Sequence, residues 1–559
     1  MESVTDEERR GSVHQRSMMI ARLERELKAR FLALYQLLRN RYLPRMIILG
    51  AVVGLLGGLA AAGFAYLILG VKYVFFGASS IAVFLDSVRA QPWPYRLVAP
   101  ALGGLLVGPI VTYVAREVYG QGVPNVIQAI GLRGGAIRFR VAPLTALASA
   151  ICIGSGGSAG RLGPIVEIGS TLGSSVARYF ELPTEQVKIL LTAGAAAGIG
   201  GTFNAPLAGI IFGLEVLLKR IDLWGLASIG VAAVVGTAVG NVALGRTAPV
   251  FDIHPYQILN YRELVFYVGL GIAGAGVALV YSNALYGMEY LFKAVFAQRA
   301  LRAAFGGLLL GAVALAYPQI QATGYPTVGQ ALQGRLPLQL MLALMAAKIL
   351  ATSLTLGSGG SGGVFGPAIF VGAMMGGAYG GIVNALFPGA TGPAYSYAIV
   401  GLAAVFAGAA HAPLASSVIL YELTGDGNVL VPAMCACIVA SVLAARLQEG
   451  SIFTRKLIKR GVDIEGLQQQ RLVSIELEVE AGSEFDGEEV GDLDLPPACL
   501  LTHCTNGRDE CILHRRTSLE ADMTITAVIP VDDFQGLAAL QRRCKARQGK
   551  KGRDRCCER

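Results

Sequence analysis

Apolar segments follow one another from about residue 46 to residue 447, and glycine, proline and serine interrupt many of them. We count about fourteen such segments, many of them shorter than the ~20 residues that a simple transmembrane helix needs. A helix that breaks inside lipid leaves backbone groups unpaired, so breaks are tolerated only where they are buried or line a cavity. The pattern therefore predicts an all-α, multi-pass membrane protein whose broken helices surround a binding site.

A different pattern begins at about Ser451, where a basic segment leads into short stretches with strand character. The stretch Val473–Glu480 alternates between apolar and polar residues, which is typical of a strand with one buried face. The other expected elements are, in order, a short helix around Glu488, strands at Cys499–Cys504, Glu510–His514 and Thr524–Ile529, and a helix at Asp532–Arg542. We therefore expect a small α+β domain at residues 471–545.

Composition supports the membrane assignment and excludes several other classes. Hydrophobic residues make up 53% of the 559 residues and charged residues 15%, whereas soluble proteins average about 25% charged. No Asp, Glu, Lys or Arg occurs in the 73 residues between Lys348 and Glu422. These values exclude a soluble enzyme, a disordered chain and a secreted disulfide scaffold. The 72 glycines favour helices that pack closely through small residues.

Basic flanks at both ends of the chain predict its orientation. Residues 1–45 carry ten Lys or Arg against six Asp or Glu, and residues 541–559 carry nine against two. By the positive-inside rule, we expect both termini in the cytoplasm and the protein in the inner (plasma) membrane. The net charge of +9 needs no nucleic-acid partner to explain it. The predicted parts are an amphipathic segment at 1–45, a membrane domain at 46–460, the α+β domain and a basic tail at 546–559.

An internal repeat divides the membrane domain into two halves. Gly154–Pro164 and Gly357–Pro367 are identical at eight of eleven positions, with an offset of 203 residues. A second set of matches, at an offset of 207, pairs Phe203–Ala208 with Ala410–Ala415 and Glu215 with Glu422. Two sets of matches at nearly one spacing indicate two structurally related halves. In transporter folds such halves are often inverted, with the binding site between them.

Each copy of the first repeat can form an anion site. Its glycines let backbone N–H groups converge, and Gly163-Pro164 is suited to open a helix. A helix N-terminus offers free N–H donors and the positive end of the helix dipole. Partial charges suit a conducted anion, because a full positive charge would hold it too tightly. Helix packing through glycine and a phosphate loop stay open as alternatives, although no Walker-type lysine follows either copy.

Three ordered motifs resemble those of the CLC family of chloride channels and proton/chloride exchangers, and the resemblance spans about residues 46–460. The motifs are Gly120-Gln-Gly-Val-Pro124, Gly160-Arg-Leu-Gly-Pro164 and Gly363-Val-Phe-Gly-Pro367. The resemblance implies a homodimer with one anion pore in each subunit, built from two inverted halves. It assigns anion binding and selectivity to Gly120, Gln121, Gly122, Gly160, Arg161, Gly163, Gly363, Val364, Phe365 and Phe453.

The departures from the family pattern concern the residues that move protons and bind anions. Leu162 stands where the family's second motif has its gating glutamate, and leucine can neither ionise nor carry a proton. Val216 falls on the exchangers' internal proton-transfer glutamate. Gln121 replaces a serine, and its amide can donate either to an anion or to backbone. Phe453 stands where the family has a tyrosine, so the ring is kept and the hydroxyl is lost.

These departures predict a passive, proton-uncoupled anion channel for chloride or similar ions, because weak coordination favours fast passage. The alternative is an anion/proton exchanger that uses another acidic residue, such as Glu167 or Glu215. We expect both carboxylates to be structural, since their spacing turns them away from the family positions. We expect no enzyme activity, no cofactor and no metal site. His503 and Cys504, for example, would point to opposite faces of one strand.

The carboxy-terminal domain has a resemblance of its own. Residues 471–545 resemble the TrkA carboxy-terminal (RCK-C) domain of potassium transport systems through strand 473–480, Gly482–Gly487, the Leu493–Leu500 segment and Val528-Ile-Pro. The resemblance implies dimerisation and the binding of a small molecule or nucleotide. A pore without a gating carboxylate needs another means of closing, so we expect this domain to be regulatory.

Overall fold

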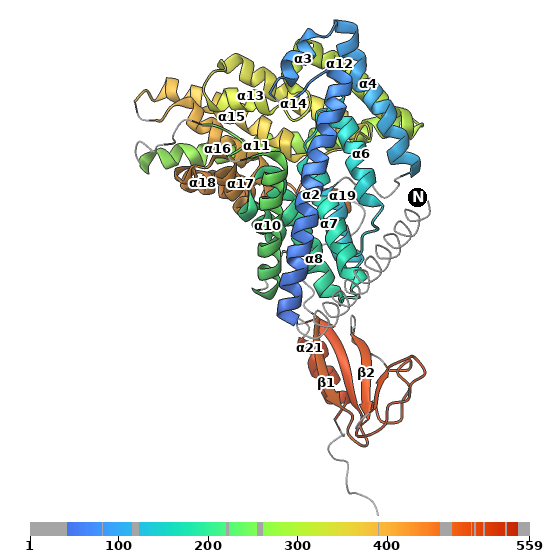
Figure 1. Ribbon diagram of the computed structural model, residues 1–559. Helices are drawn as coiled ribbons and strands as arrows, with labels where there is room; N and C mark the ends of the chain where they lie inside the picture. Colours follow the sequence, from blue (N-terminus) through green and yellow to red (C-terminus); the bar gives the residue numbers. More distant parts are fainter. Residues whose placement is uncertain are drawn as a thin grey trace, which may run out of the picture. The chain divides into compact units, whose positions relative to one another are not determined.

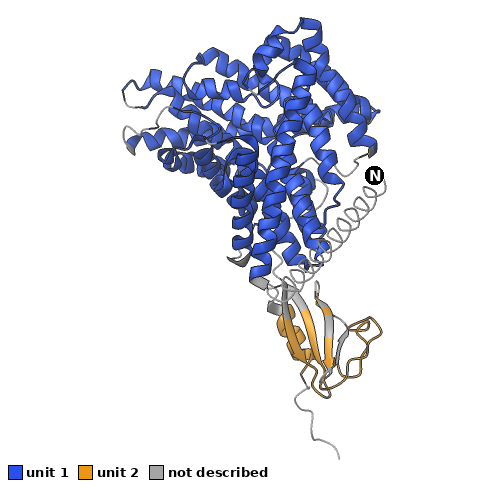
Figure 2. Cartoon of the chain, in the orientation of Figure 1, with its two compact units in different colours: residues 1–462 blue, residues 463–559 orange. Residues whose placement is uncertain are grey.

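The computed structural model describes residues 42–80, 82–114, 122–219, 223–246, 248–253, 256, 261–389, 391–458, 472–493, 495–496, 499–506, 509–530 and 534–545. The chain forms two compact units, residues 1–462 and 463–559 (Figure 2). The predicted basic tail and nearly all of the predicted amino-terminal segment lie outside the described residues.

The first unit consists of helices (Figure 1). Its first half contains α2 (Tyr42–Phe76), α3 (Phe84–Ala90), α4 (Trp93–Pro109), η1 (Ile110–Val114), α5 (Val123–Leu132), α6 (Val141–Gly154), α7 (Leu162–Tyr179), α8 (Thr184–Phe203), α9 (Pro206–Phe212), η3 (Gly213–Leu218) and α10 (Leu223–Leu244). Its second half contains η4 (Tyr261–Glu263), α11 (Leu264–Val295), α12 (Arg299–Ala316), η5 (Pro318–Ile320), α13 (Tyr325–Leu332), α14 (Leu338–Gly357), α15 (Phe365–Leu386), α16 (Ala394–Ala410), α17 (Pro413–Thr424), η6 (Gly427–Val429), α18 (Leu430–Leu447) and α19 (Arg455–Ile458).

The lengths of these helices fit a membrane domain with interrupted spans. Within the described ranges, seven helices are long and apolar enough to cross a membrane, the first at Pro44–Phe76 and the last at Gly427–Leu447. Five further apolar helices have only 10–17 residues, fewer than the ~20 that a simple span needs. The predicted all-α membrane domain with broken helices is therefore confirmed.

Reciprocal hydrogen bonds relate the two halves of this domain. The hydroxyl oxygens of Ser149 and Ser361 are 2.9 Å apart, and those of Ser158 and Thr352 are 3.0 Å apart. At the repeat offset of 203 residues, Ser149 corresponds to Thr352, the partner of Ser158. Ser158 in turn corresponds to Ser361, the partner of Ser149. An interaction that exchanges its partners in this way is expected where two similar halves face each other across a two-fold axis.

The second repeat also has the same geometry in both halves. The residue that follows α8, Asn204, has φ +56°, and the residue that follows α16, His411, has φ +55°. Both residues adopt the left-handed conformation that terminates a helix. A proline then opens the next short helix, α9 or α17. The broken helices that the sequence predicts thus break at equivalent residues of the two halves.

Glycine allows the helices of each half to approach closely. A Cβ atom on Gly169 of α7 would lie 2.1 Å from the carbonyl oxygen of Gly194 of α8. The equivalent glycines of the second half, Gly372 of α15 and Gly401 of α16, show the same contact at 2.4 Å. No larger side chain fits at such distances, so the high glycine content reflects backbone-to-backbone packing of helix pairs.

The second unit is a small α+β domain, as expected from the alternating pattern. Its strands are β1 (Leu472–Glu478), β2 (Leu500–Asn506), β3 (Asp509–Ile512) and β4 (Thr524–Pro530), followed by α21 (Phe534–Arg543). The sheet is antiparallel with the order β1-β4-β2-β3. Phe485, Leu519, Ile525 and Leu540 are fully buried in its core. Burial raises the pKa of the Cys544 thiol to about 11, so this thiol behaves as a core group.

One predicted element of this unit is wrong. Residues around Glu488 form turns, and the structure contains no helix there. The Leu519 N–H donates to the Glu488 carbonyl at 3.0 Å, and the Gly487 N–H donates to the Leu519 carbonyl at 2.7 Å. Backbone groups that pair with a distant segment are not free to form the local bonds of a helix, which accounts for the difference.

Candidate functional site

The two halves of the membrane domain meet at glycines of the second and third motifs. Gly160 and Gly363 exchange two backbone hydrogen bonds, each with an N···O distance of 2.7 Å. A Cβ on Gly363 would lie 2.6 Å from the Gly163 nitrogen, and a Cβ on Gly160 would lie 2.6 Å from the Gly366 nitrogen. Gly122 of the first motif packs on Gly163 with φ +72°. Residues from all three motifs therefore converge at one place.

This bridge involves two of the glycines that the sequence predicts as anion ligands. The Gly160 N–H donates to the Gly363 carbonyl, and the Gly363 N–H donates to the Gly160 carbonyl. In this structure each of the two N–H groups is therefore occupied by a carbonyl of the other half. These two glycines join the halves, which the sequence alone did not indicate, and their role in anion binding stays a prediction.

The amides that remain free to bind an anion are those of two helix N-termini. Helix α7 begins at Leu162 and α15 begins at Phe365, and neither preceding residue, Arg161 or Val364, forms a side-chain cap. The N–H groups of a first helical turn have no partner within their own helix. Together with the positive ends of the helix dipoles, they form a site suited to an anion.

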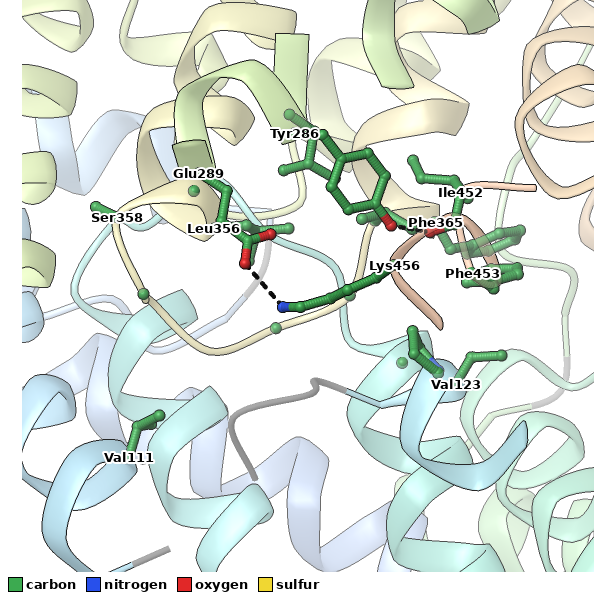
Figure 3. Close-up of a pocket in the computed structure, with 18 of the residues that line it drawn as sticks. Val111, Val123, Tyr286, Glu289, Leu356, Ser358, Phe365, Ile452, Phe453 and Lys456 are labelled. Carbon is green, nitrogen blue, oxygen red and sulfur yellow. Dashed lines mark hydrogen bonds and ion pairs between the residues drawn. The ribbon is translucent and has the colours of Figure 1, made fainter. Parts of the chain in front are cut away.

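A cavity next to these helix starts contains residues of all three motifs (Figure 3). The lining residues that the sequence predicted are Leu162, Gly163, Gly363, Val364, Phe365 and Phe453, and Val123 and Pro124 of the first motif accompany them. Leu162 is 1% exposed and lines the cavity, so its apolar side chain forms part of the cavity wall. Gly120 and Gln121, which the sequence also assigned to the site, lie outside the described residues.

Arg161 is not among the described residues that line this cavity, and its predicted role in anion binding stays a prediction. Its guanidinium carbon lies 5.2 Å from the centroid of the Phe203 ring and 5.5 Å from that of the Tyr325 ring. Arg161 lines a second cavity together with Lys72 and Arg246. The arginine is therefore held by aromatic rings, a favourable arrangement for a cation.

A continuous row of aromatic side chains lies beside the cavity. The sequence predicted two of its members, Phe365 and Phe453, as site residues, whereas the other three rings were not expected there. Phe453 packs against Phe212 and Phe406, with ring centroids 6.4 and 6.5 Å apart. Phe365 packs against Phe406 at 4.6 Å and Phe203 at 5.7 Å. The five rings come from separate segments of the chain, so no sequence spacing could have indicated that they pack in one row. At Phe453 the row presents an apolar ring to the cavity, without a hydroxyl group.

Two tyrosines of α11 hold the segments that line the cavity. The Tyr281 hydroxyl donates to the Val364 carbonyl at 2.9 Å, directly before α15. The Tyr286 hydroxyl donates to the Ile452 carbonyl at 2.6 Å, directly before Phe453. Both bonds fix backbone next to a predicted anion-binding residue. No motif in the sequence marks these tyrosines as part of the site.

Charged residues of α11 and α19 were also not identified from the sequence. Glu289 and Lys456 line the cavity and form an ion pair of 2.9 Å. Glu289 and Lys293 are the two charged positions in the otherwise apolar sequence of α11. Ionisable residues within a membrane span are candidates for function, so a usable signal was present in the sequence.

Glu167 is an anchor rather than part of the cavity lining. It is 1% exposed and accepts hydrogen bonds from the Gly122 N–H at 3.0 Å, Asn125 Nδ2 at 2.7 Å and Thr145 Oγ1 at 3.2 Å. Three donors satisfy most of the capacity of a buried carboxylate. Glu167 thus fastens the first motif to α7, in line with the structural role expected for it.

Glu215 and Glu422 cap helices in opposite halves of the domain. The Glu215 carboxylate accepts hydrogen bonds from the N–H groups of Leu414 and Ala415, at 3.1 and 2.6 Å, at the start of α17. The Glu422 carboxylate does the same at the start of α9, at 3.0 and 2.7 Å. Val216, the neighbour of Glu215, is buried in η3 and is not among the described residues that line the cavity.

We expect Glu215→Gln and Glu422→Gln to destabilise the protein to a similar extent. In each variant one of the two backbone N–H groups faces an amide NH₂ in place of a carboxylate oxygen, at a cost of about 1–3 kcal/mol. Thermal unfolding of the purified protein measures this effect. Glu185→Gln is the matched control, because this exposed carboxylate pairs with Lys188 and, within the described residues, caps no helix start of the other half. If either variant changed the coupling between proton and anion movement and kept its thermal stability, the capping role would be contradicted.

These features define a multi-pass membrane protein built from two related halves, with helix N-termini directed at a cavity between them. The chain belongs to the voltage-gated chloride channel family, because the family model described as "Voltage gated chloride channel" matches residues 103–445. The family that the three motifs predicted is thereby confirmed. The predicted TrkA-C likeness of the second unit stays a prediction.

Curated relatives support this assignment. The chain is 33% identical over 426 residues to a chloride channel protein of Ralstonia nicotianae described as ClcB-like, covering 75% of this chain and 98% of the relative. It is 30% identical over 410 residues to the voltage-gated ClC-type chloride channel ClcB of Salmonella typhimurium, covering 73% and 98%.

Solved structures share the fold of the membrane domain. A slow cyanobacterial Cl⁻/H⁺ antiporter matches with a TM-score of 0.66 and 24% identity, over 75% of this chain and 98% of the antiporter chain. A CLC-type fluoride/proton antiporter matches with a TM-score of 0.62 and 23% identity, over 74% and 97%. At these identities the likeness concerns the fold.

Proposed function

We propose that this protein is a passive, proton-uncoupled channel for chloride or similar small anions. The observation that carries the proposal is the side chain of Leu162, which opens α7 and lines the cavity. An apolar group at this position neither competes with an anion for the helix N-termini nor carries a proton. Anion passage then depends on backbone partial charges, which bind weakly enough to release the ion.

Two further positions support the absence of proton coupling. By the family resemblance, Val216 stands at the position of the exchangers' internal proton-transfer glutamate, and its apolar side chain is buried in η3. Phe453 lines the cavity without a hydroxyl group that could bind an anion. Fewer side-chain ligands mean weaker and less selective anion coordination, which favours conduction over tight binding.

An anion/proton exchanger is the second candidate function. Two solved structures with this fold are described as a Cl⁻/H⁺ antiporter and a fluoride/proton antiporter. A carboxylate other than the family's would then carry the proton. Glu289 fits that requirement best among the described acidic residues, because it lines the cavity, whereas Glu167 and Glu215 are committed to backbone N–H groups.

The proposal includes an assembly and a location. As the family resemblance implies, the protein forms a homodimer in the inner (plasma) membrane, with one pore per subunit and both termini in the cytoplasm. Basic residues near both ends of the chain support this orientation. The α+β unit binds a small molecule or nucleotide and thereby regulates conduction.

Chloride efflux from liposomes that contain the purified full-length protein tests conduction. We expect valinomycin alone, which lets potassium follow, to release internal chloride. The proposal would be contradicted if the liposomes released chloride only when a proton carrier was added together with valinomycin. Liposomes without protein control for leakage.

Deleting residues 465–559 tests the regulatory part of the proposal. We expect the truncated membrane domain to conduct chloride and to lose its response to the ligand of the α+β unit. Chloride efflux from full-length and truncated protein, measured with and without candidate nucleotides, gives the comparison. Identical flux and identical responses in the two proteins would remove the regulatory role.

A further inference from the structure

The cavity contains a charged pair that the family motifs do not include. The formally charged residues among its described lining residues are Glu289, Arg302 and Lys456. The Arg302 Nε donates to the Phe296 carbonyl at 2.7 Å, which directs that group to backbone. Figure 3 shows Lys456 extending across the cavity toward the carboxylate of Glu289, at 2.9 Å.

The position of Lys456 relates it to the anion-binding residues. It lies three residues after Phe453, and both side chains line the same cavity. The bond from Tyr286 to the Ile452 carbonyl holds this segment on α11, one helical turn before Glu289. The segment is therefore anchored by a neutral hydrogen bond that does not depend on the ion pair.

Glu289 has a second cation within reach. Lys293 lies 2.6 Å from the same carboxylate oxygen that Lys456 contacts. The side chain of Lys293 is 42% exposed, whereas those of Glu289 and Lys456 are 18% and 20% exposed. If the Glu289 carboxylate moves away from Lys456, it remains paired with Lys293. The partly buried negative charge of Glu289 is therefore still compensated.

We propose that Lys456 is a side-chain ligand for the conducted anion and that the Glu289 carboxylate competes with the anion for it. This inference rests on the proposed anion pathway. A small anion that reaches Lys456 takes the place of the carboxylate, which Lys293 then holds. Lys456 supplies a full positive charge at a cavity where Leu162 and Phe453 offer no charge. The competing carboxylate of Glu289 keeps the anion from being held too tightly.

Three variants of the full-length protein test the competition by chloride flux at graded chloride concentrations. We expect Glu289→Gln to lower the half-saturating chloride concentration about three- to tenfold, since Lys456 loses its competitor. We expect Lys456→Met to reduce flux about tenfold and Lys456→Arg to retain most of it. Glu185→Gln is the matched control, because it makes the same change in another Glu–Lys pair. That pair, Glu185 with Lys188, also has an N···O distance of 2.9 Å and does not line the cavity.

The double variant Glu289→Gln/Lys456→Met separates competition from simple repulsion of anions by the glutamate. If Glu289 acts through Lys456, the double variant conducts like Lys456→Met. A flux clearly above that of Lys456→Met overturns the competition. If the pair only anchors α19, Glu289→Gln lowers flux and melting temperature together, and this outcome also overturns the inference.

Proton movement recorded in the same experiment distinguishes the inference from the proposed function. Proton uptake by the unmodified protein refutes the passive channel, whatever the chloride dependence of the variants. Loss of that uptake in Glu289→Gln, with chloride flux retained, makes Glu289 a proton carrier and overturns the competition as well. If Glu289→Gln does not fold, the contrast between Lys456→Met and Lys456→Arg decides whether the charge at this position carries the anion.

Discussion

Replacing Leu162 with glutamate is expected to lower chloride flux at about pH 7 by tenfold or more, and acid is expected to restore it. Leu162 is the first residue of α7, is 1% exposed and lines the cavity. A carboxylate at this position would accept hydrogen bonds from the free N–H groups of the helix start, where the anion would otherwise bind.

The pH dependence of this variant follows from the charge of the new side chain. A glutamate is ordinarily ionised at neutral pH, and in that form it blocks the site. As the pH falls, protonation removes the negative charge and its attraction to the helix N-terminus. Chloride efflux from liposomes between neutral and acidic pH measures the recovery.

Two substitutions at the same position provide controls. Leu162→Gln has nearly the size of glutamate without a charge, so its flux is expected to be independent of pH. Leu162→Ala shortens the apolar wall and is expected to raise flux if the leucine narrows the pore. Unchanged flux in Leu162→Glu at neutral pH would show that this residue does not border the path of the anion.

Gly363→Ala is expected to abolish chloride flux, because it separates the two halves of the membrane domain. The new Cβ atom would lie 2.6 Å from the Gly163 nitrogen, and backbone cannot yield as a flexible side chain can. Overpacking of this kind costs about 1–3 kcal/mol. It also disturbs the paired bonds between Gly160 and Gly363, each of 2.7 Å. Flux and thermal unfolding of the purified protein measure the loss.

The repeat supplies an independent check on this prediction. Gly160→Ala places a Cβ atom 2.6 Å from the Gly366 nitrogen, so it should have the same consequence from the other half. Gly276→Ala is the control, because a Cβ there meets nothing within 4 Å and alanine suits the interior of α11. Normal flux in Gly363→Ala would mean that close contact at this glycine is not required.

Much of the membrane domain could be predicted from sequence because its constraints are local or repeated. Charge-free apolar stretches indicate lipid, and glycine–proline motifs indicate helix starts whatever the rest of the fold does. The offsets of 203 and 207 residues reappear in the structure as exchanged contacts, such as Ser149 with Ser361 and Ser158 with Thr352. The repeat indicated the two halves, and the resemblance indicated the three motifs. Neither indicated which residues of the two halves contact each other.

The contacts that make the site depend on three-dimensional proximity, which sequence spacing does not reveal. The amides of Gly160 and Gly363 bind each other, although their motif suggests anion ligands. Phe212, Phe406 and Phe453 form one row from three distant segments. The helix expected around Glu488 failed for a related reason, since backbone there pairs with residues near Leu519.

The measurement that tests passive conduction most directly is proton movement under an imposed chloride gradient. Liposomes that contain the purified protein are placed in a chloride gradient with no initial proton gradient, and external pH is recorded as chloride flows. The absence of an ionisable side chain at Leu162 and Val216 predicts chloride flux without proton movement. Protons driven uphill in fixed proportion to chloride would contradict the channel and establish an exchanger.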